Sequence, residues 1–277
     1  MACSGCVSGT LHEGTPTGTV ETLYGLATYV ASPPSGTAPK GTVVIIPDAF
    51  GWKFNNNRIL ADNYAKKGSF RVLLPDFMGG WDLNPELLNI MDYVTEKHES
   101  LGVHTFWKAV YVVRGIPMFV SWLYGARHSA TWPGVLGYFK KLRSEDESQP
   151  IGAAGFCWGG KHVFLLARDT EKSASGKSLI NAGFTAHPSS LKLPADIDAV
   201  KLPVSVACPS EDHHIRGDKI LEVEAGLKQC PAECEVKTYE GATHGFAVRA
   251  NPKVPKENEQ GIEAEDQAIS WFTKFFS

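Results

Sequence analysis

The sequence lacks several features that would point to whole classes of protein. No apolar run approaches the roughly 18 residues that a membrane-spanning helix needs. No Lys- or Arg-rich stretch offers a basic surface for nucleic acid, and the net charge is only −3. These absences predict that neither a membrane nor nucleic acid is a partner.

Cysteine is also scarce, with 6 residues in 277, which is too few for a disulfide scaffold. The first residues, MACSGCVSGT, show neither the basic segment nor the long apolar segment of a secretory signal. The pairs Cys3/Cys6 and Cys230/Cys234 could supply four zinc ligands, but the second spacing is loose and no histidine adjoins either pair. We therefore expect reduced thiols, a cytoplasmic location and no bound metal.

Short apolar runs alternate with helix-like stretches along most of the chain. The runs are nearly continuous in Val, Ile, Leu and Ala, as in strands that are covered on both faces. Alternation of such strands with helices predicts an α/β fold in which a mostly parallel sheet is flanked by helices. The expected strands are 42–47, 71–76, 151–156, 181–187, 203–209 and 233–240, and the expected helices are 55–68, 158–169, 219–230 and 263–276.

Two segments depart from this alternation. Residues 18–33 have β-rich halves around Gly25, which predicts an antiparallel hairpin at the edge of the sheet. Residues 77–143 are rich in tryptophan and predict a helical insertion that lies over the carboxyl edge of the sheet, where α/β proteins bind ligands. No repeat or linker-like tract interrupts the chain, so a single domain over residues 1–277 is expected.

The segment GFCWGG, residues 155–160, places Cys157 in a G-x-C-x-G frame between an expected strand and an expected helix. This is the context of a nucleophile elbow, and a helix N-terminus favours the thiolate form of a cysteine. The backbone N–H of Trp158 would then be placed to stabilise an oxyanion. A free cysteine is also among the residues most often buried, so the motif alone leaves a structural role equally open.

Two further residues complete a possible catalytic triad. Asp212 follows one expected strand, with Glu211 and Asp218 as alternatives, and His244 follows the next strand. Both positions lie at the strand ends that meet the elbow. The chain order of nucleophile, acid and histidine is that of α/β hydrolases, so the pattern predicts a triad of Cys157, Asp212 and His244.

The other histidines carry weaker signals. His187 ends the strand 181–187 and could line the site, although a hydrogen-bonded structural histidine is the favoured interpretation. His162 lies on the helix after the elbow and is expected to pack. His213 and His214 adjoin Asp212 and are expected to flank it without a direct role.

Together, GFCWGG, the Asp212 loop and GATHGFAVR resemble the dienelactone hydrolase family, the carboxymethylenebutenolidases, of the α/β-hydrolase superfamily. The segments CSGCVSGTLHEGTPTG and PDAFGW are most similar to the fungal branch. The resemblance spans nearly the whole chain and is weakest over residues 80–145. It implies the α/β-hydrolase fold, a Cys157–His244–Asp212 triad and no cofactor.

The resemblance also implies an acidic residue after the first long strand, usually glutamate, which holds the resting thiol and releases it when substrate binds. The matching position is Asp48, whose shorter side chain must sit closer or act through water. The alternative is that Asp48 only caps its loop. The resemblance also implies that the backbone of the next residue, Ala49, gives the second oxyanion N–H.

Bacterial members of the family bind a substrate carboxylate with arginines, one of them shortly after the histidine. Arg249 lies near that position, shifted by one residue, and the alternative is a solvated surface arginine. A second such arginine has no clear match, which leaves specificity for acidic dienelactones open. Phe50, Trp52 and Trp81 are expected to line the substrate site beside Trp158, and the alternative for these aromatic residues is the core.

The resulting expectation is an enzyme that hydrolyses a small lactone or activated ester through a cysteine. Two alternatives stay open. A biosynthetic enzyme could use the same triad to cleave or cyclise a polyketide lactone or thioester, and a non-catalytic relative could bind ligands or sense oxidants. The C-terminal WFTKFF could be core or interface, so a homodimer is possible.

Overall fold

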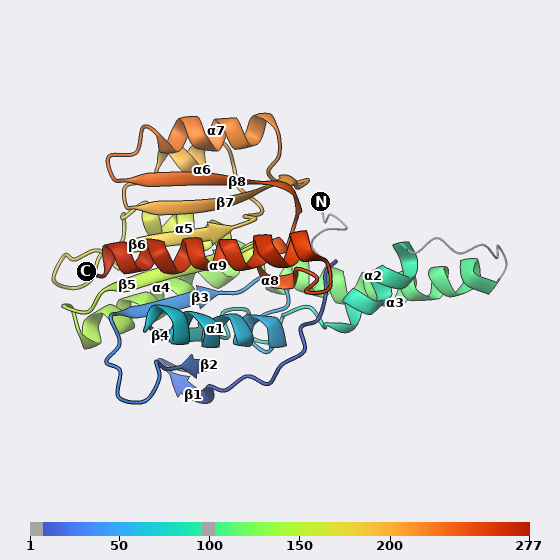
Figure 1. The fold of residues 1–277 in the computed structure, drawn as a ribbon, viewed down its shortest axis with the longest axis horizontal. Helices are drawn as coiled ribbons and strands as arrows, with labels where there is room; N and C mark the ends of the chain where they lie inside the picture. Colours follow the sequence, from blue (N-terminus) through green and yellow to red (C-terminus); the bar gives the residue numbers. More distant parts are fainter. Residues whose placement is uncertain (1–7, 96–102) are drawn as a thin grey trace.

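The computed structural model describes residues 8–95 and 103–277, which form an eight-stranded sheet with helices on both sides (Figure 1). The strand order is β1-β2-β4-β3-β5-β6-β7-β8. The strands are β1 (Thr19–Leu23), β2 (Leu26–Ala31), β3 (Thr42–Ile46), β4 (Arg71–Pro75), β5 (Ile151–Phe156), β6 (Ala182–Ala186), β7 (Val204–Glu211) and β8 (Cys234–Thr243).

The helices come between and after the strands. They are α1 (Asn55–Gly68), α2 (Glu86–Thr95), α3 (Val103–Gly125), α4 (His128–Glu145), α5 (Trp158–Ala167), α6 (Ala195–Asp198), α7 (Asp218–Leu227), α8 (Phe246–Arg249) and α9 (Pro255–Phe275). In the part of the sheet from β4 through β3 to β8, all neighbouring strands pair in parallel. This confirms the predicted α/β fold with a mostly parallel sheet.

The predicted hairpin is confirmed at the edge of the sheet. β1 and β2 pair antiparallel, with Leu23 opposite Leu26 across a two-residue turn. Both turn residues, Tyr24 and Gly25, have positive φ (55° and 90°), as the tight turns of β-hairpins require. β2 then pairs antiparallel with β4, which joins the hairpin to the parallel strands.

The central strands are buried on both faces, as their continuous apolar composition predicts. In β3, Val43 and Ile45 belong to the core that α1 and α9 cover. Val44 and Ile46 alternate with them and belong to the core that α4 and α5 cover. The strand therefore ends between two helical layers, and its carboxyl end leads directly into the site described below.

The last helix is longer than predicted. The expected range was 263–276, but α9 begins at Pro255. Its first two turns are almost entirely polar, and its buried positions start at Ala264, so only the second part shows an apolar face. Pro255 at the first helical position and Glu257 in the first turn are the sequence signals of the true start.

The helical insertion between β4 and β5 is confirmed, but its predicted position over the carboxyl edge is wrong for much of it. α4 packs into the core through Val135, Tyr138 and Phe139. α2 and most of α3 instead project from the body as a helical arm (Figure 1). The base of this arm is fixed where Trp81 packs against Gly125, since a Cβ atom there would lie 2.1 Å from the indole.

Candidate active site

Cys157 occupies a strained turn between β5 and α5. It is the N-cap residue of α5 and has φ 51° and ψ −109°, a conformation that non-glycine residues rarely adopt. Its N–H donates to the Ala186 carbonyl, and its own carbonyl accepts from the N–H of Ser189, so the end of β6 holds the turn from both sides. The side chain is only 1% exposed, and its sulfur lies 3.8 Å from Ser189 Oγ.

A glycine at position 159 allows this turn to press against the end of β3. A Cβ atom there would lie 2.0 Å from the Ile46 carbonyl oxygen and 2.9 Å from that of Pro47. No side chain could occupy that space without moving the backbone. The first turn of α5, which begins at Trp158, therefore packs against the end of β3 and the segment that leads into Asp48 and Ala49.

His244 and Asp212 form a buried pair beside Cys157. Asp212 follows β7 and His244 follows β8, and the distance from His244 Nδ1 to Asp212 Oδ2 is 2.7 Å. The second oxygen of Asp212 accepts the His214 N–H at 2.8 Å. Asp212 is completely buried, whereas the alternative acid Glu211 is exposed. The structure thus places Asp212, rather than Glu211 or Asp218, on the histidine.

Asp48 lies at the carboxyl end of β3 and is also completely buried. One of its oxygens accepts from Asn57 Nδ2 at 3.0 Å and from the Phe50 N–H at 3.2 Å, and the other pairs with Arg249. Arg249 is itself 2% exposed, so its interpretation as a solvated surface residue is wrong. The two predicted site residues therefore pair with each other in the interior of the protein.

The predicted aromatic wall is dispersed, and three of its four members lie in the core. Phe50 is 1% exposed and packs between Phe54 and the Arg249 guanidinium. Trp52 is buried in the core on the α1 side, under Arg58. Trp158 is buried in the opposite core, where its indole donates to the Ala126 carbonyl at 2.6 Å. Trp81 is 47% exposed at the base of the arm.

The model of the dienelactone hydrolase family matches residues 26–276, nearly the whole chain. The chain belongs to the dienelactone hydrolase family. "Hydrolase tropI" of Talaromyces stipitatus is 28% identical over 270 residues, with 98% of this chain and 95% of that protein covered. The human "Carboxymethylenebutenolidase homolog" is 26% identical over 238 residues, with 84% and 82% covered.

Solved structures support the same fold. The dienelactone hydrolase from Anabaena variabilis superposes with a TM-score of 0.55 over 95% of this chain and 99% of that one, at 16% sequence identity. Membership of the dienelactone hydrolase family makes this protein a hydrolase of the carboxylic ester class, in the broad sense that includes lactones.

The charges of this dienelactone hydrolase-like site favour an imidazolium at His244. Burial opposes that charge, but the neighbouring Cys157 and the hydrogen bond to Asp212 outweigh it and raise the pKa of His244 from 6.5 to about 10. Since the thiolate form of Cys157 stabilises the imidazolium, the imidazolium equally stabilises the thiolate. The site therefore favours the charged form of His244, which Asp212 holds in place through its hydrogen bond.

The pKa of His244 provides the first test. In the intact protein we expect the imidazole to titrate near pH 10, as followed by NMR of labelled histidine. Because the folded-state pKa is raised, this group adds stability that is complete below pH 6.5 and is lost as the pH rises through about 10. Cys157→Ala removes the neighbouring sulfur while burial remains, so the pKa of His244 should fall.

A matched control is Cys234→Ala, which removes a thiol on β8 away from the triad and should leave the titration of His244 unchanged. An unchanged pKa of His244 in Cys157→Ala would contradict the pairing of sulfur and imidazole.

Burial raises the pKa of Asp48, and the nearby Cys157 acts in the same direction, whereas Arg249, Asn57 and the Phe50 amide oppose it. The family resemblance implies an acid that holds the resting thiol. In this family member, both oxygens of Asp48 are engaged by Asn57, Phe50 and Arg249. These contacts fix the Asp48 side chain, and its role in holding the resting thiol stays a prediction.

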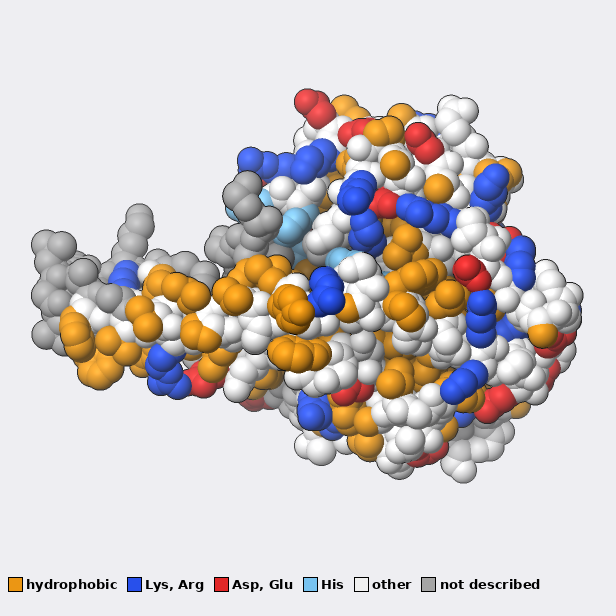
Figure 2. Space-filling view, turned by 180° about the vertical axis from the view of Figure 1, so that it is seen from behind, with side chains coloured by type: hydrophobic (Ala, Val, Ile, Leu, Met, Phe, Trp, Pro, Cys, Tyr) orange, Lys and Arg blue, Asp and Glu red, His pale blue; other side chains and the backbone are white. Residues whose placement is uncertain are grey.

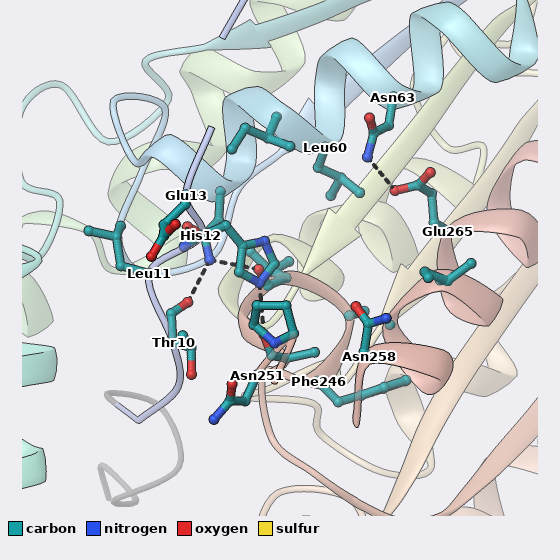
Figure 3. Close-up of a pocket in the computed structure, with 18 of the residues that line it drawn as sticks. Thr10, Leu11, His12, Glu13, Leu60, Asn63, Phe246, Asn251, Asn258 and Glu265 are labelled. Carbon is teal, nitrogen blue, oxygen red and sulfur yellow. Dashed lines mark hydrogen bonds between the residues drawn. The ribbon is translucent and has the colours of Figure 1, made fainter. Parts of the chain in front are cut away.

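Residues near the N-terminus fix the segment that carries Arg249. Thr10 N–H donates to the Arg249 carbonyl, and His12 Nε2 lies 2.7 Å from the Ala250 carbonyl. Asn56 on α1 bonds to the backbone of Thr10, His12 and Val248. These residues line a cavity of about 590 Å³ between α1, α8 and α9 (Figure 3). The N-terminal segment therefore acts as a strap over α8.

Two residues with contacts at the site were not identified from the sequence, and one was interpreted wrongly. Ser189 lies beside the Cys157 sulfur, and Asn57 binds Asp48. His187 was expected to be a hydrogen-bonded structural histidine, which is wrong: it is fully buried, and neither ring nitrogen has a hydrogen-bond partner in the described part of the chain. The segment TAHPS does not predict that His187 has a φ of 40° or that its ring centroid lies 4.9 Å from that of His244.

His162 and the two cysteine pairs lie outside the triad. His162 is fully buried and packs against Trp158 and Trp132, as expected. Cys3 and Cys6 lie outside the described residues, and the sulfurs of Cys230 and Cys234 both approach the Leu202 carbonyl. Within residues 8–95 and 103–277, no three His, Cys, Asp or Glu side chains are grouped to hold a metal ion.

Proposed function

We propose that this protein hydrolyses a small lactone or activated ester, with Cys157 as the nucleophile of a Cys157–His244–Asp212 triad. The observation that carries the proposal is the buried His244–Asp212 pair beside a cysteine held at a strained helix N-cap. Packing alone does not require these three polar groups to converge at one sheet edge. Family membership supports a hydrolase, and the geometry supports the proposed catalytic triad.

In the first step, the Cys157 thiolate attacks the carbonyl carbon of the substrate. The negative charge moves to the carbonyl oxygen, where the N–H groups of Trp158 and Ala49 are the proposed donors. The contact between Gly159 and the end of β3 supports this assignment, since it fixes the two amide-bearing segments relative to each other. His244, held by Asp212, gives its proton to the leaving oxygen as the tetrahedral intermediate collapses.

In the second step, water hydrolyses the thioester. His244, now neutral, takes a proton from the water, and the resulting hydroxide attacks the thioester carbonyl. The acid product leaves and the thiolate–imidazolium pair is restored. A thiolate leaves a tetrahedral intermediate more readily than an alkoxide or an amine does, so the cycle favours esters whose leaving group is a good one, such as an enol.

The charge of the site limits the substrate. Arg249 is the residue near the family's carboxylate-binding position, and here its guanidinium is buried against Asp48. A substrate carboxylate would have to break that pair. We therefore propose uncharged lactones or activated esters, in preference to acidic dienelactones, as the substrate class.

The test is a panel of an uncharged enol lactone, a carboxylate-bearing dienelactone, p-nitrophenyl acetate, an acyl thioester and an anilide. We expect kcat/KM to be highest for the uncharged enol lactone and the activated ester, and the anilide to be inert. A preference for the acidic dienelactone would contradict the proposed substrate class. A preference for the thioester would favour the biosynthetic alternative, and no turnover of any substrate would contradict hydrolysis by this site.

A further inference from the structure

The projecting arm exposes a row of large apolar side chains along α3. Phe106, Val113, Ile116, Val120 and Leu123 are between 50% and 67% exposed. Hydrophobic side chains gather along the arm in Figure 2, where the rest of the surface is mixed. Soluble proteins rarely leave such a continuous patch open, so the row calls for a partner.

The spacing of the row matches a coiled-coil seam. With Ala109 included, its positions are 106, 109, 113, 116, 120 and 123, which alternate by three and four residues over three heptads. This is the a/d pattern with which one helix packs against another helix of the same spacing. The pattern therefore specifies the partner as a helix with an apolar row of similar length.

The row is not the face that α3 uses within the chain. Gly115, Met118 and Trp122 lie on the opposite side of the helix: a Cβ at Gly115 would meet Leu87 on α2, and the other two pack against the core. α3 is thus apolar on two faces. One of them is covered by its own fold, and the other faces outward.

The chemistry of the row permits a second copy of the same chain. No position from 106 to 123 in the a/d pattern carries a charge, so two such rows would meet without repulsion. Arg114 lies off the row and is paired with Glu86. Pro117 lies at a flanking position inside the helix and bends such helices, so a short crossed contact fits better than a long supercoil.

The size of the exposed row can be compared with what a stable dimer needs. A standard interface buries about 800 Å² on each partner. The row and the flanking Val112 and Tyr124, which are 44% and 68% exposed, offer large side chains that such an interface could bury. A two-fold axis would let each copy offer the same surface to the other, which is the commonest arrangement of soluble oligomers.

A membrane is the other surface that could cover apolar side chains. Within the described residues, no single helix is long and apolar enough to cross a bilayer. The helical segments 106–125 and 128–145 would be long and apolar enough only together, as a pair with a bend of 55° between them. The second helix of that pair, α4, is packed into the core through Tyr138, Phe139 and Leu142. It could not enter a membrane while the fold is kept.

From these observations we infer that this protein forms a homodimer in which the α3 rows of two copies, Phe106 to Leu123, pack against each other. The test uses light scattering of the full chain over a dilution series. We expect a mass twice the 30.1 kDa of one chain. The double variant Val113→Glu/Val120→Glu should associate at least about 100-fold more weakly, because it would bury two charges on each copy.

A matched control is Val20→Glu/Leu221→Glu, which changes two residues that are exposed to a similar extent (54% and 61%) on β1 and α7. It should remain dimeric. Near-ultraviolet circular dichroism of all three proteins separates lost association from lost folding. A monomeric intact chain, or a Val113→Glu/Val120→Glu variant that stays dimeric, would overturn the inference.

The same proteins are sedimented with vesicles of phosphatidylcholine and phosphatidylserine. We expect the intact dimer to remain in solution. The dimer would be overturned in favour of a lipid surface if the intact chain were a monomer that sediments with the vesicles and the Val113→Glu/Val120→Glu variant did not sediment.

Discussion

Replacement of Cys157 by alanine is expected to lower kcat/KM for p-nitrophenyl acetate at least about 10⁴-fold, because members of a triad act as one unit and loss of the nucleophile removes the covalent route. The fold should persist, since the side chain only shrinks by one sulfur in a site fixed by backbone contacts. Steady-state hydrolysis at matched protein concentration measures the effect.

Cys234→Ala is the matched control for this loss. It removes a partly buried thiol from β8 without touching Asp212 or His244, and we expect its activity to lie within a factor of about two of the intact protein, as for substitutions away from the site. If Cys157→Ala retained more than a tenth of the activity, the nucleophile would have to be another group.

The second large effect concerns stability. Arg249→Met leaves the Asp48 carboxylate fully buried without its cation, and loss of one partner of a buried pair costs about 3–5 kcal/mol. Urea unfolding should show this as a lower midpoint with an unchanged slope. Because the pKa of Asp48 is raised in the folded state, and more so without Arg249, the loss should shrink as the pH is lowered and the carboxyl takes up a proton.

Two comparisons isolate this effect. Arg114→Met breaks an exposed pair with Glu86, in which the side chains are 54% and 42% exposed, and should cost no more than about 1 kcal/mol. Asp48→Asn/Arg249→Met removes both charges, and should recover much of the stability lost in Arg249→Met alone. Equal losses for Arg114→Met and Arg249→Met would show that the Asp48–Arg249 pair does not stabilise the fold as described.

Much of this architecture could be predicted from the sequence because local rules decide it. Continuous apolar runs specify strands buried on both faces, and β3 shows this directly in the alternation of Val43 and Val44 between two cores. The positions of Cys157, Asp212 and His244 also follow from local signals. Each lies where a strand ends, and parallel strands end at one edge.

The Asp48–Arg249 pair could not be predicted in the same way. The two residues are 201 positions apart, and their contact depends on how the N-terminal strap holds α8. His187 illustrates the same limit, since its burial beside His244 without a hydrogen-bond partner in the described structure is a property of the assembled site. The sequence could place Asp48, Arg249 and His187 near the edge of the sheet, but their contacts there depend on the assembled fold.

The arm misleads for a different reason. α3 is apolar on two faces, and a helix that is apolar all round is ordinarily a buried one. The tryptophan-rich composition of residues 77–143 had led to the prediction of an insertion over the carboxyl edge of the sheet. In the structure, one face packs on the base of the arm and on α2, and the other remains exposed, which is the face that we propose packs against a second copy of the chain.

The central claim is that Cys157 forms a covalent acyl intermediate. The most direct test quenches the protein with acid within the first turnover of p-nitrophenyl acetate and maps the acetyl group by mass spectrometry. We expect one acetyl group on the peptide that contains Cys157, formed with a burst of p-nitrophenol and absent from Cys157→Ala. Acetyl transfer to another residue, or turnover with no burst and no adduct under any quench time, would contradict the account.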